Sequence, residues 1–212
     1  MSRSNPQNIG LLNNTFNRQG YTNDELEKIG NAIIYMAEHI PQLSKTKLLK
    51  LIYLLDEFSV KNFGIPFFDL EYKVWQAGPV NVDLYSELSN DTYLLKDFIK
   101  LDFNKKGECY IHPKKKFNDD EFSENEIELL EKIVKSYKKY TAKQLVELCH
   151  RPSTLWYQVA KDQGLLELFE SGKRNTTDFS IPLSDCIKDD SFKLSLYNDH
   201  KEFLNFSQRF KV

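Results

Sequence analysis

Histidines, cysteines and one lysine within an apolar segment are the residues of this sequence that could carry chemistry. His39, His112 and His200 stand alone, and Cys149 is followed directly by His150. Zinc ligands normally come as two pairs with a few residues between the members of each pair, so this spacing predicts no metal site. The motifs of serine hydrolases, zinc peptidases, phosphate loops and dinucleotide folds are missing. We expect no cofactor and assign no catalytic residue. An enzyme with a site near His150 stays open as an alternative, because triads form in space and not in sequence.

Three lysines lie in the first six residues of an apolar segment that reads as a helix over 45–62. Lys45 and Lys47 lie in its first turn, where the helix dipole disfavours cations, so they indicate either ordinary tolerance or an anionic partner. Lys50 lies among leucines, and we expect its ammonium to reach the surface or to pair with a carboxylate. Lys45 and Lys47 are the first candidates for mapping a partner.

Residues 141–149 and 153–161 have the spacing of a helix-turn-helix. A DNA-reading second helix offers polar side chains to base edges, and here only Gln158 and Lys161 do so among apolar and aromatic neighbours. Packing is the favoured use of this face. A nucleic-acid-binding regulator remains the alternative.

The composition sets the broad class. The chain has 212 residues, 41% hydrophobic and 28% charged, with a net charge of −2. These values are typical of a soluble globular protein and lack the basic excess of a nucleic-acid-binding domain. Apolar runs are too short to span a bilayer, and the first residues lack a secretory signal. Three scattered cysteines favour a reducing compartment, so we expect a cytoplasmic protein without membrane contact.

Hydrophobic periodicity predicts an α+β fold, a mainly helical single domain with a small antiparallel sheet or hairpin. The expected helices are 25–37, 45–62, 80–89, 123–137, 141–149, 154–161 and one within 184–206; the expected strands are 70–75, 98–103, 108–111 and an extended piece at 179–183. Gly64 suits a left-handed helix cap, Pro79 suits a first helical turn, and Ser153 suits an N-cap. We expect a flexible tail over 1–23, a central domain over 24–165 and an extension over 166–212 packing on it.

Two blocks resemble a known family. The first is KLLKLIYLLD at 47–56, followed by VWQAGPVNVDLY at 74–85; the second is FSE at 122–124, then YTAKQLVELCH at 140–150 and Trp156. Together they are similar to the Panacea domain of SocA-like antitoxins and phage-associated GepA-like proteins, over about residues 25–164. The sequence departs from the family pattern at Val74, Ala77 and Cys149, which leaves the role of the position before His150 undefined.

The resemblance implies a binding platform and no catalyst. Members of the family act as the antitoxin half of a toxin–antitoxin pair and neutralise toxins by direct protein contact, and some hand the toxin to a protease. The expected partner is therefore a protein toxin, with a protease as a second partner class and DNA disfavoured. The oligomeric state is not predicted.

The resemblance also selects the site residues. The family-motif positions, expected to be structural, are Lys50, Tyr53, Trp75, Gly78, Pro79, Val80, Tyr85, His150 and Trp156. Buried aromatic rings need partners for their polar ends, so we expect the large rings to hold the Gly78-Pro79 turn against two helices. A partner surface beside this turn would use Lys45, Lys47, Gln76, Asn81 and Asp83, since binding anchors are flanked by polar rims.

Overall fold

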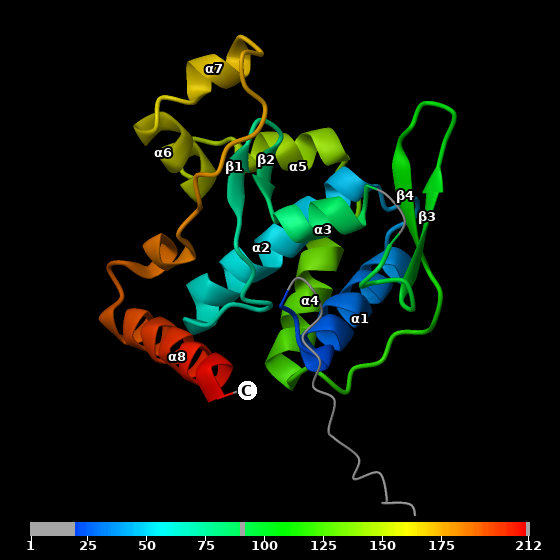
Figure 1. The fold of residues 1–212 in the computed structure, drawn as a ribbon, viewed down its shortest axis with the longest axis horizontal. Coiled ribbons are helices and arrows are strands. Elements are labelled where there is room, and N and C mark those ends of the chain that lie inside the picture. Colours follow the sequence, from blue (N-terminus) through cyan, green and yellow to red (C-terminus); the bar gives the residue numbers. More distant parts are fainter. Residues whose placement is uncertain (1–19, 90–91, 211–212) are drawn as a thin grey trace, which may run out of the picture.

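The structure is a computed structural model that describes residues 20–89 and 92–210 (Figure 1). Its α-helices are α1 (Asn23–His39), α2 (Lys45–Phe63), α3 (Val82–Glu87), α4 (Glu124–Tyr137), α5 (Ala142–Cys149), α6 (Leu155–Asp162), α7 (Leu166–Glu170) and α8 (Ser191–Phe210). The strands are β1 (Lys73–Trp75), β2 (Gly78–Val80), β3 (Ile99–Phe103) and β4 (Cys109–Pro113), and a 3₁₀ helix, η1, covers Leu183–Ile187. The predicted mainly helical α+β single domain is confirmed.

Helix α2 is the central element of the fold. Its side chains are buried from Lys47 through Glu57, as the apolar pattern around the whole helix predicted, because α4, α5, β2, η1 and α8 enclose it. Ser44 caps its first turn, and Gly64 ends it in the left-handed conformation with φ +76°. The predicted glycine cap is confirmed. An added Cβ at Gly64 would lie 2.9 Å from the Lys193 carbonyl oxygen, so Gly64 also permits the close approach of α8.

Strands β1 and β2 form a tight antiparallel hairpin in which Val74 pairs with Pro79 and Trp75 with Gly78. Pro79 is therefore a strand residue, and the prediction that it opens a helix is wrong. Asn81 takes that role, because its Oδ1 accepts a hydrogen bond from the Leu84 N–H at 2.9 Å and starts α3. The predicted strand at 70–75 shortens to three residues.

An extended segment, 175–181, runs along the free edge of β1. The Val74 N–H donates to the Phe179 carbonyl at 2.9 Å, and the Ile181 N–H donates to the Tyr72 carbonyl at 2.8 Å. The extended piece expected at 179–183 thus lies partly here, and from Leu183 the chain turns into η1. Ile181 and Leu183 join the hydrophobic core.

Strands β3 and β4 form the predicted second hairpin, with Gly107 in the left-handed region at φ +77°. In the helical half, Thr141 and Gln144 form a capping box at the start of α5, with reciprocal hydrogen bonds of 3.2 and 2.8 Å. The predicted Ser153 cap is wrong by one residue, because the Thr154 hydroxyl accepts from the Tyr157 N–H at 3.3 Å. Helix α7 was not predicted.

The predicted segment boundaries stay predictions. Residues 1–19 of the expected tail lie outside the described residues. In the described part of the chain, no helix is long and apolar enough to cross a membrane.

Candidate functional site

Lys50 lies at the centre of the family-motif residues. Its side chain is 1% exposed, and its ammonium donates a hydrogen bond to the Pro79 carbonyl oxygen at 2.6 Å. Burial lowers the pKa of Lys50 to about 8. Lys50 neither reaches the surface nor forms a carboxylate ion pair among the described residues, so both expectations for it were wrong. A carbonyl of the β-hairpin satisfies it instead.

Gly78 is required by this arrangement for two reasons. Its φ of +98° lies in the region that favours glycine, and an added Cβ would lie 3.1 Å from Lys50 Cε. The absence of a side chain at Gly78 therefore lets the β1–β2 hairpin pack directly on the Lys50 side chain of α2.

The two tryptophans join β1 to later parts of the chain. The Trp156 Nε1–H donates to the Trp75 carbonyl at 2.9 Å, and the Trp75 Nε1–H donates to the Thr177 carbonyl at 3.2 Å. The Trp75 ring also packs edge-on against Tyr85, with centroids 4.8 Å apart. These rings hold the Gly78-Pro79 hairpin against α3 and α6.

His150 ends α5 as its C-cap residue and stacks flat on Trp156, with ring centroids 3.9 Å apart and 14° between the planes. Burial, with a smaller contribution from the Lys50 charge, lowers the pKa of His150 to about 4, so the ring is neutral at pH 7. Its Nε2 atom has no hydrogen-bond partner among the described residues.

Tyr53 also departs from expectation. Its ring packs edge-on against Tyr72 at 5.1 Å, and its hydroxyl is buried without a hydrogen-bond partner in the described part of the chain. The neighbouring hydroxyl of Tyr72 donates to Asp56 Oδ2 at 2.6 Å, and Asp56 also accepts from the Phe68 N–H at 2.6 Å. Burial raises the pKa of Asp56 to about 6. Val80 is buried beside this region in β2.

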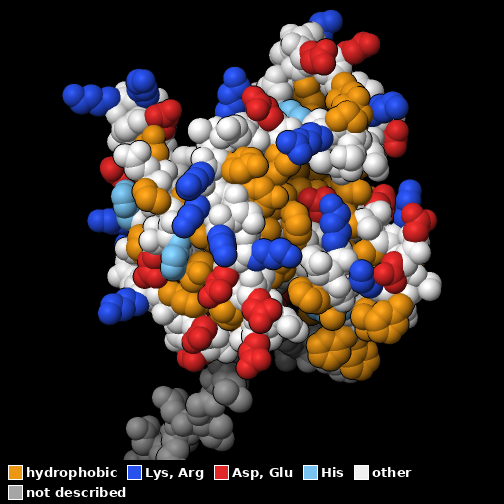
Figure 2. Space-filling model, turned by 180° about the vertical axis from the view of Figure 1, so that it is seen from behind, with side chains coloured by type: hydrophobic (Ala, Val, Ile, Leu, Met, Phe, Trp, Pro, Cys, Tyr) orange, Lys and Arg blue, Asp and Glu red, His pale blue; other side chains and the backbone are white. Residues whose placement is uncertain are grey.

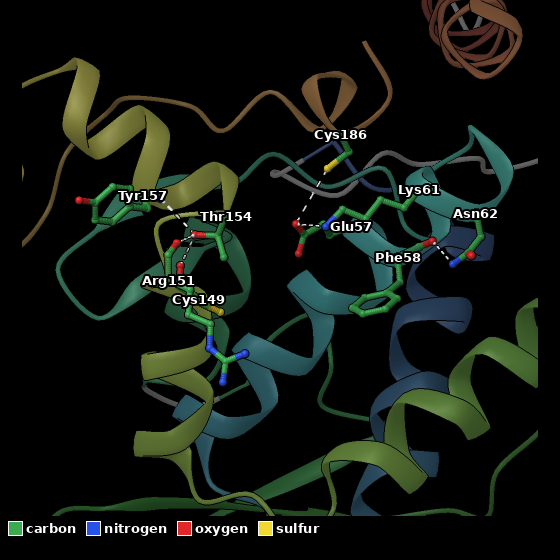
Figure 3. A network of polar contacts seen from close by, with 9 residues as sticks. All are labelled: Glu57, Phe58, Lys61, Asn62, Cys149, Arg151, Thr154, Tyr157 and Cys186. Atoms are coloured by element: carbon green, nitrogen blue, oxygen red, sulfur yellow. Dashed lines mark hydrogen bonds and ion pairs between the residues drawn. The ribbon is translucent and has the colours of Figure 1, made fainter. Parts of the chain in front are cut away.

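Sequence reasoning overlooked two acids of α2, Asp56 and Glu57. Glu57 is buried, accepts from the Lys61 ammonium at 2.8 Å and lies 3.9 Å from the Cys186 thiol (Figure 3). Burial, followed by the Glu57 charge, raises the pKa of Cys186 to about 12. The usable signal was the same as for Lys50, a charged residue inside a segment that is apolar on all sides.

The polar positions predicted to face a partner divide into two groups. Lys47 is 7% exposed and donates to the Lys138 carbonyl at 2.8 Å, and Asn81 is buried as the α3 cap, so both offer little surface. Gln76 is exposed, although its amide donates to the Phe169 carbonyl at 2.6 Å. Asp83 accepts from the Tyr21 hydroxyl at 3.1 Å. Their roles in binding stay predictions.

Lys45 lies over the face of the Tyr85 ring, with Nζ 3.5 Å from the centroid, and also bonds the Ser89 hydroxyl. Tyr85 is 38% exposed, and its ring also packs against the Trp75 ring, so a cation and two rings form one continuous group. Helix α3, which carries Tyr85, lies between the two hairpins (Figure 1).

A cleft opens on each side of α3. The larger cleft, of about 800 Å³, is lined by Lys45, Tyr85, Phe103, Tyr110 and Tyr140 among others. The smaller cleft, of about 480 Å³, is lined by Trp75, Val82, Arg174 and Phe179 among others. We call Lys45, Trp75, Val82, Tyr85 and Phe179 the α3 surface. It combines exposed apolar side chains with a cation, which is the composition of binding anchors.

The described residues contain no group of three or more His, Cys, Asp or Glu side chains that could hold a metal ion. No curated protein and no solved structure matches the chain. A family model described as "Antitoxin SocA-like, Panacea domain" matches residues 48–157, which run from α2 to α6 and include the hairpin, the α3 surface residues of that range and the His150–Trp156 stack. Because this match covers more than half of the 212 residues, the chain belongs to the SocA-like antitoxin family with a Panacea domain.

Proposed function

We propose that this protein neutralises a partner toxin by binding it directly through the α3 surface. The family assignment gives the antitoxin-like role in general, and the Lys45–Tyr85–Trp75 group between two clefts is the observation that supports this location. The proposed setting is the cytoplasm, in a type II toxin–antitoxin system or a phage-associated system. A protease is the second class of partner.

The chemistry of the α3 surface suits a protein partner. Tyrosine, tryptophan and other aromatic residues carry much of the binding energy in protein interfaces when apolar ring and polar end are both contacted. Phe103 and Tyr140, 50% and 38% exposed, add apolar area at the rim of the larger cleft. The Lys45 charge favours an acidic or carbonyl-rich segment of the toxin.

The support beneath this surface makes it rigid. The Trp75 indole donates a hydrogen bond to the Thr177 carbonyl, and the Trp75 carbonyl accepts one from the Trp156 indole. The hydrogen bond from Lys50 to the Pro79 carbonyl fixes the hairpin that carries Trp75. A preorganised surface loses little conformational entropy on binding, which favours affinity.

Co-expression with the product of the adjacent gene tests the proposal, with growth and co-purification as readouts. We expect Tyr85→Ala combined with Lys45→Glu to weaken binding by about a hundredfold, since two anchors are lost. Lys143→Glu is the matched control, because Lys143 is an 86% exposed lysine on α5. Circular dichroism checks the fold. Equal rescue of growth by the double variant contradicts the proposed surface.

Two further measurements test the alternative functions, which are DNA binding and catalysis near His150. A gel shift at two salt concentrations tests DNA binding, for which α6 offers the exposed side chains of Gln158 and Lys161 next to the acidic Asp162. His150→Ala tests the enzyme alternative. Neutralisation that survives this change with the fold intact leaves catalysis without a candidate residue.

A further inference from the structure

The β3–β4 hairpin has one closed edge and one open edge. The β4 edge is closed, because the Ile111 N–H donates to the Leu43 carbonyl at 2.9 Å and Ser44 forms a β-bridge with Tyr110. Along the β3 edge, no backbone segment of the described residues pairs with positions 101–103. The hairpin stands at one side of the molecule, on the right in Figure 1. Seen from behind in Figure 2, it is the projection at the upper left and carries charges of both signs.

The hydrogen bonds at the two ends of the hairpin show which residues of β3 face β4. At one end the Phe98 carbonyl accepts from the Lys114 N–H at 2.8 Å, and at the other end the Asn104 N–H donates to the Glu108 carbonyl at 3.1 Å. Hydrogen-bonded and non-hydrogen-bonded positions alternate along an antiparallel pair. The backbone groups of the even-numbered positions 98–104 therefore face β4.

The backbone groups of Ile99, Leu101 and Phe103 consequently face the open edge. The Ile99 N–H agrees with this, because it donates outside the hairpin to the Leu95 carbonyl at 3.1 Å. The N–H and C=O groups of Leu101 and Phe103 and the Ile99 carbonyl are left for a partner strand. Such a row of unpaired groups is a template for pairing with another chain.

The side chains of β3 carry two opposite charges on the solvent side. Ile99 is fully buried and Leu101 is partly buried, whereas Lys100 and Asp102 are exposed. Neither Lys100 nor Asp102 belongs to an ion pair within the described part of the chain. The open edge therefore presents one cation and one anion, two residues apart.

This spacing makes the edge complementary to itself. When two β3 strands pair antiparallel with Leu101 opposite Leu101, Lys100 of each copy lies opposite Asp102 of the other. A register centred on position 100 would place Lys100 opposite its own copy, and one centred on position 102 would do the same with Asp102. Opposite charges stabilise a cross-strand pair and like charges destabilise it, so the charges select the register centred on Leu101.

We propose that the β3 edge pairs with the β3 edge of a second copy of this chain, antiparallel about a two-fold axis at Leu101. The two Leu101 residues exchange N–H···O=C hydrogen bonds, and each Phe103 N–H donates to the partner's Ile99 carbonyl. Lys100 and the partner's Asp102 then occupy a non-hydrogen-bonded pair, where side chains lie closest. Because the interface is isologous, it closes both open edges at once and assembly stops at a dimer.

The second copy is favoured over an unrelated extended segment because the same residues supply both sides of the match. The dimer joins two two-stranded hairpins into one continuous sheet. It also sets the partner beside the larger cleft, whose rim includes Phe103. The inference does not depend on the proposed function, since the protein is its own partner in the experiments that follow.

Sedimentation velocity of the full chain tests the dimer. We expect wild type to pass from monomer to dimer between about 1 and 300 μM. We expect Lys100→Asp and Asp102→Lys each to weaken dimerisation at least about tenfold, because either change turns two attractive pairs into two repulsive ones. Lys143→Asp is the matched control, since it reverses the charge of an 86% exposed lysine on α5. Circular dichroism checks that each variant is folded.

Mixing the two charge-reversed variants tests the register. In the mixed dimer, Asp at position 100 of one copy meets Lys at position 102 of the other, and the second pair keeps the wild-type charges. We therefore expect an equimolar mixture to dimerise although each variant alone does not. A wild type that stays monomeric at about 300 μM, or a dimer that neither reversal weakens, overturns the inference. A mixture that stays monomeric overturns the register.

Hydrogen exchange measured by mass spectrometry locates the contact. We expect the amides of a peptide that covers 99–103 to exchange more slowly as the protein concentration rises, and those of α5 to keep their rate. Exchange in β3 that does not change with concentration overturns the interface. Protection of β3 that appears only when a toxin is bound overturns the choice of a second copy as the occupant.

Discussion

Replacing Lys50 by methionine tests the central contact of the motif. Lys50 is fully buried, and its pKa is about 8 where an ordinary lysine has 10.5. Each pKa unit corresponds to about 1.4 kcal/mol, so burying the charged form costs about 3 kcal/mol at pH 7. Because the folded-state pKa is depressed, the unfolded chain binds more protons between these values, and stability rises as pH rises.

Lys50→Met removes the free-energy cost of burying the ammonium charge, and it also removes the hydrogen bond to the Pro79 carbonyl oxygen at 2.6 Å. A hydrogen bond to a charged donor contributes about 1.5–3 kcal/mol, so the two terms nearly cancel at pH 7. At higher pH the wild-type lysine becomes neutral and keeps its bond. We expect wild type to gain about 2 kcal/mol over Lys50→Met between about pH 7 and pH 10.

Urea unfolding followed by tryptophan fluorescence measures this difference, since Trp75 and Trp156 both lie next to the hairpin. Subtracting the unfolding free energy of Lys50→Met from that of wild type cancels the pH dependence that their shared titratable groups contribute. Lys143→Met is the control, because that lysine is 86% exposed and its replacement removes no buried charge. A difference between wild type and Lys50→Met that stays flat across this pH range refutes the argument that burial lowers the pKa of Lys50 in the folded protein.

Three further predictions concern neighbours of this contact. Gly78→Val is expected to unfold or misfold the domain, because its Cβ meets Lys50 at 3.1 Å at a φ of +98°; a folded variant that loses only partner binding places Gly78 in the interface instead. Trp156→Phe removes the bond to the Trp75 carbonyl and should lower the unfolding free energy by about 1–3 kcal/mol in urea titrations, and an unchanged midpoint contradicts this. Burial raises the pKa of Asp56 from 3.8 to about 6, so its contribution to stability falls by about 2 kcal/mol as pH rises from about 4 to 7. The difference in unfolding free energy between wild type and Asp56→Asn should show this decline, and a rise with pH contradicts the argument.

Local patterns predicted the regular elements well. The all-round apolar run of α2, its Gly64 cap and the Thr141–Gln144 capping box each depend on residues within one or two turns. Such interactions are readable because their partners are a fixed few residues away. The prediction of Pro79 as a helix start was wrong, because pairing with Val74 decided its conformation.

The partners of the site residues depended on contacts across the chain. Lys50 finds a carbonyl 29 residues away, and Trp156 finds one 81 residues away. No local pattern indicates which carbonyl of a turn remains free to accept a hydrogen bond. The neutral, stacked ring of His150 follows likewise from burial against Trp156, and burial is a property of the packed molecule.

The sequence by itself determined the mainly helical α+β class, the enclosed central helix and the family resemblance, because these are written in periodicity, caps and motif order. Only the tertiary structure decided that Lys47 and Asn81 are buried, that Tyr85 is exposed, and that Lys45 is half-buried over the Tyr85 ring. The physical reason is that exposure depends on which elements pack together. Two residues two positions apart on one helix thus have different partners: the Lys45 ammonium lies over the Tyr85 ring, and the Lys47 ammonium donates to the Lys138 carbonyl.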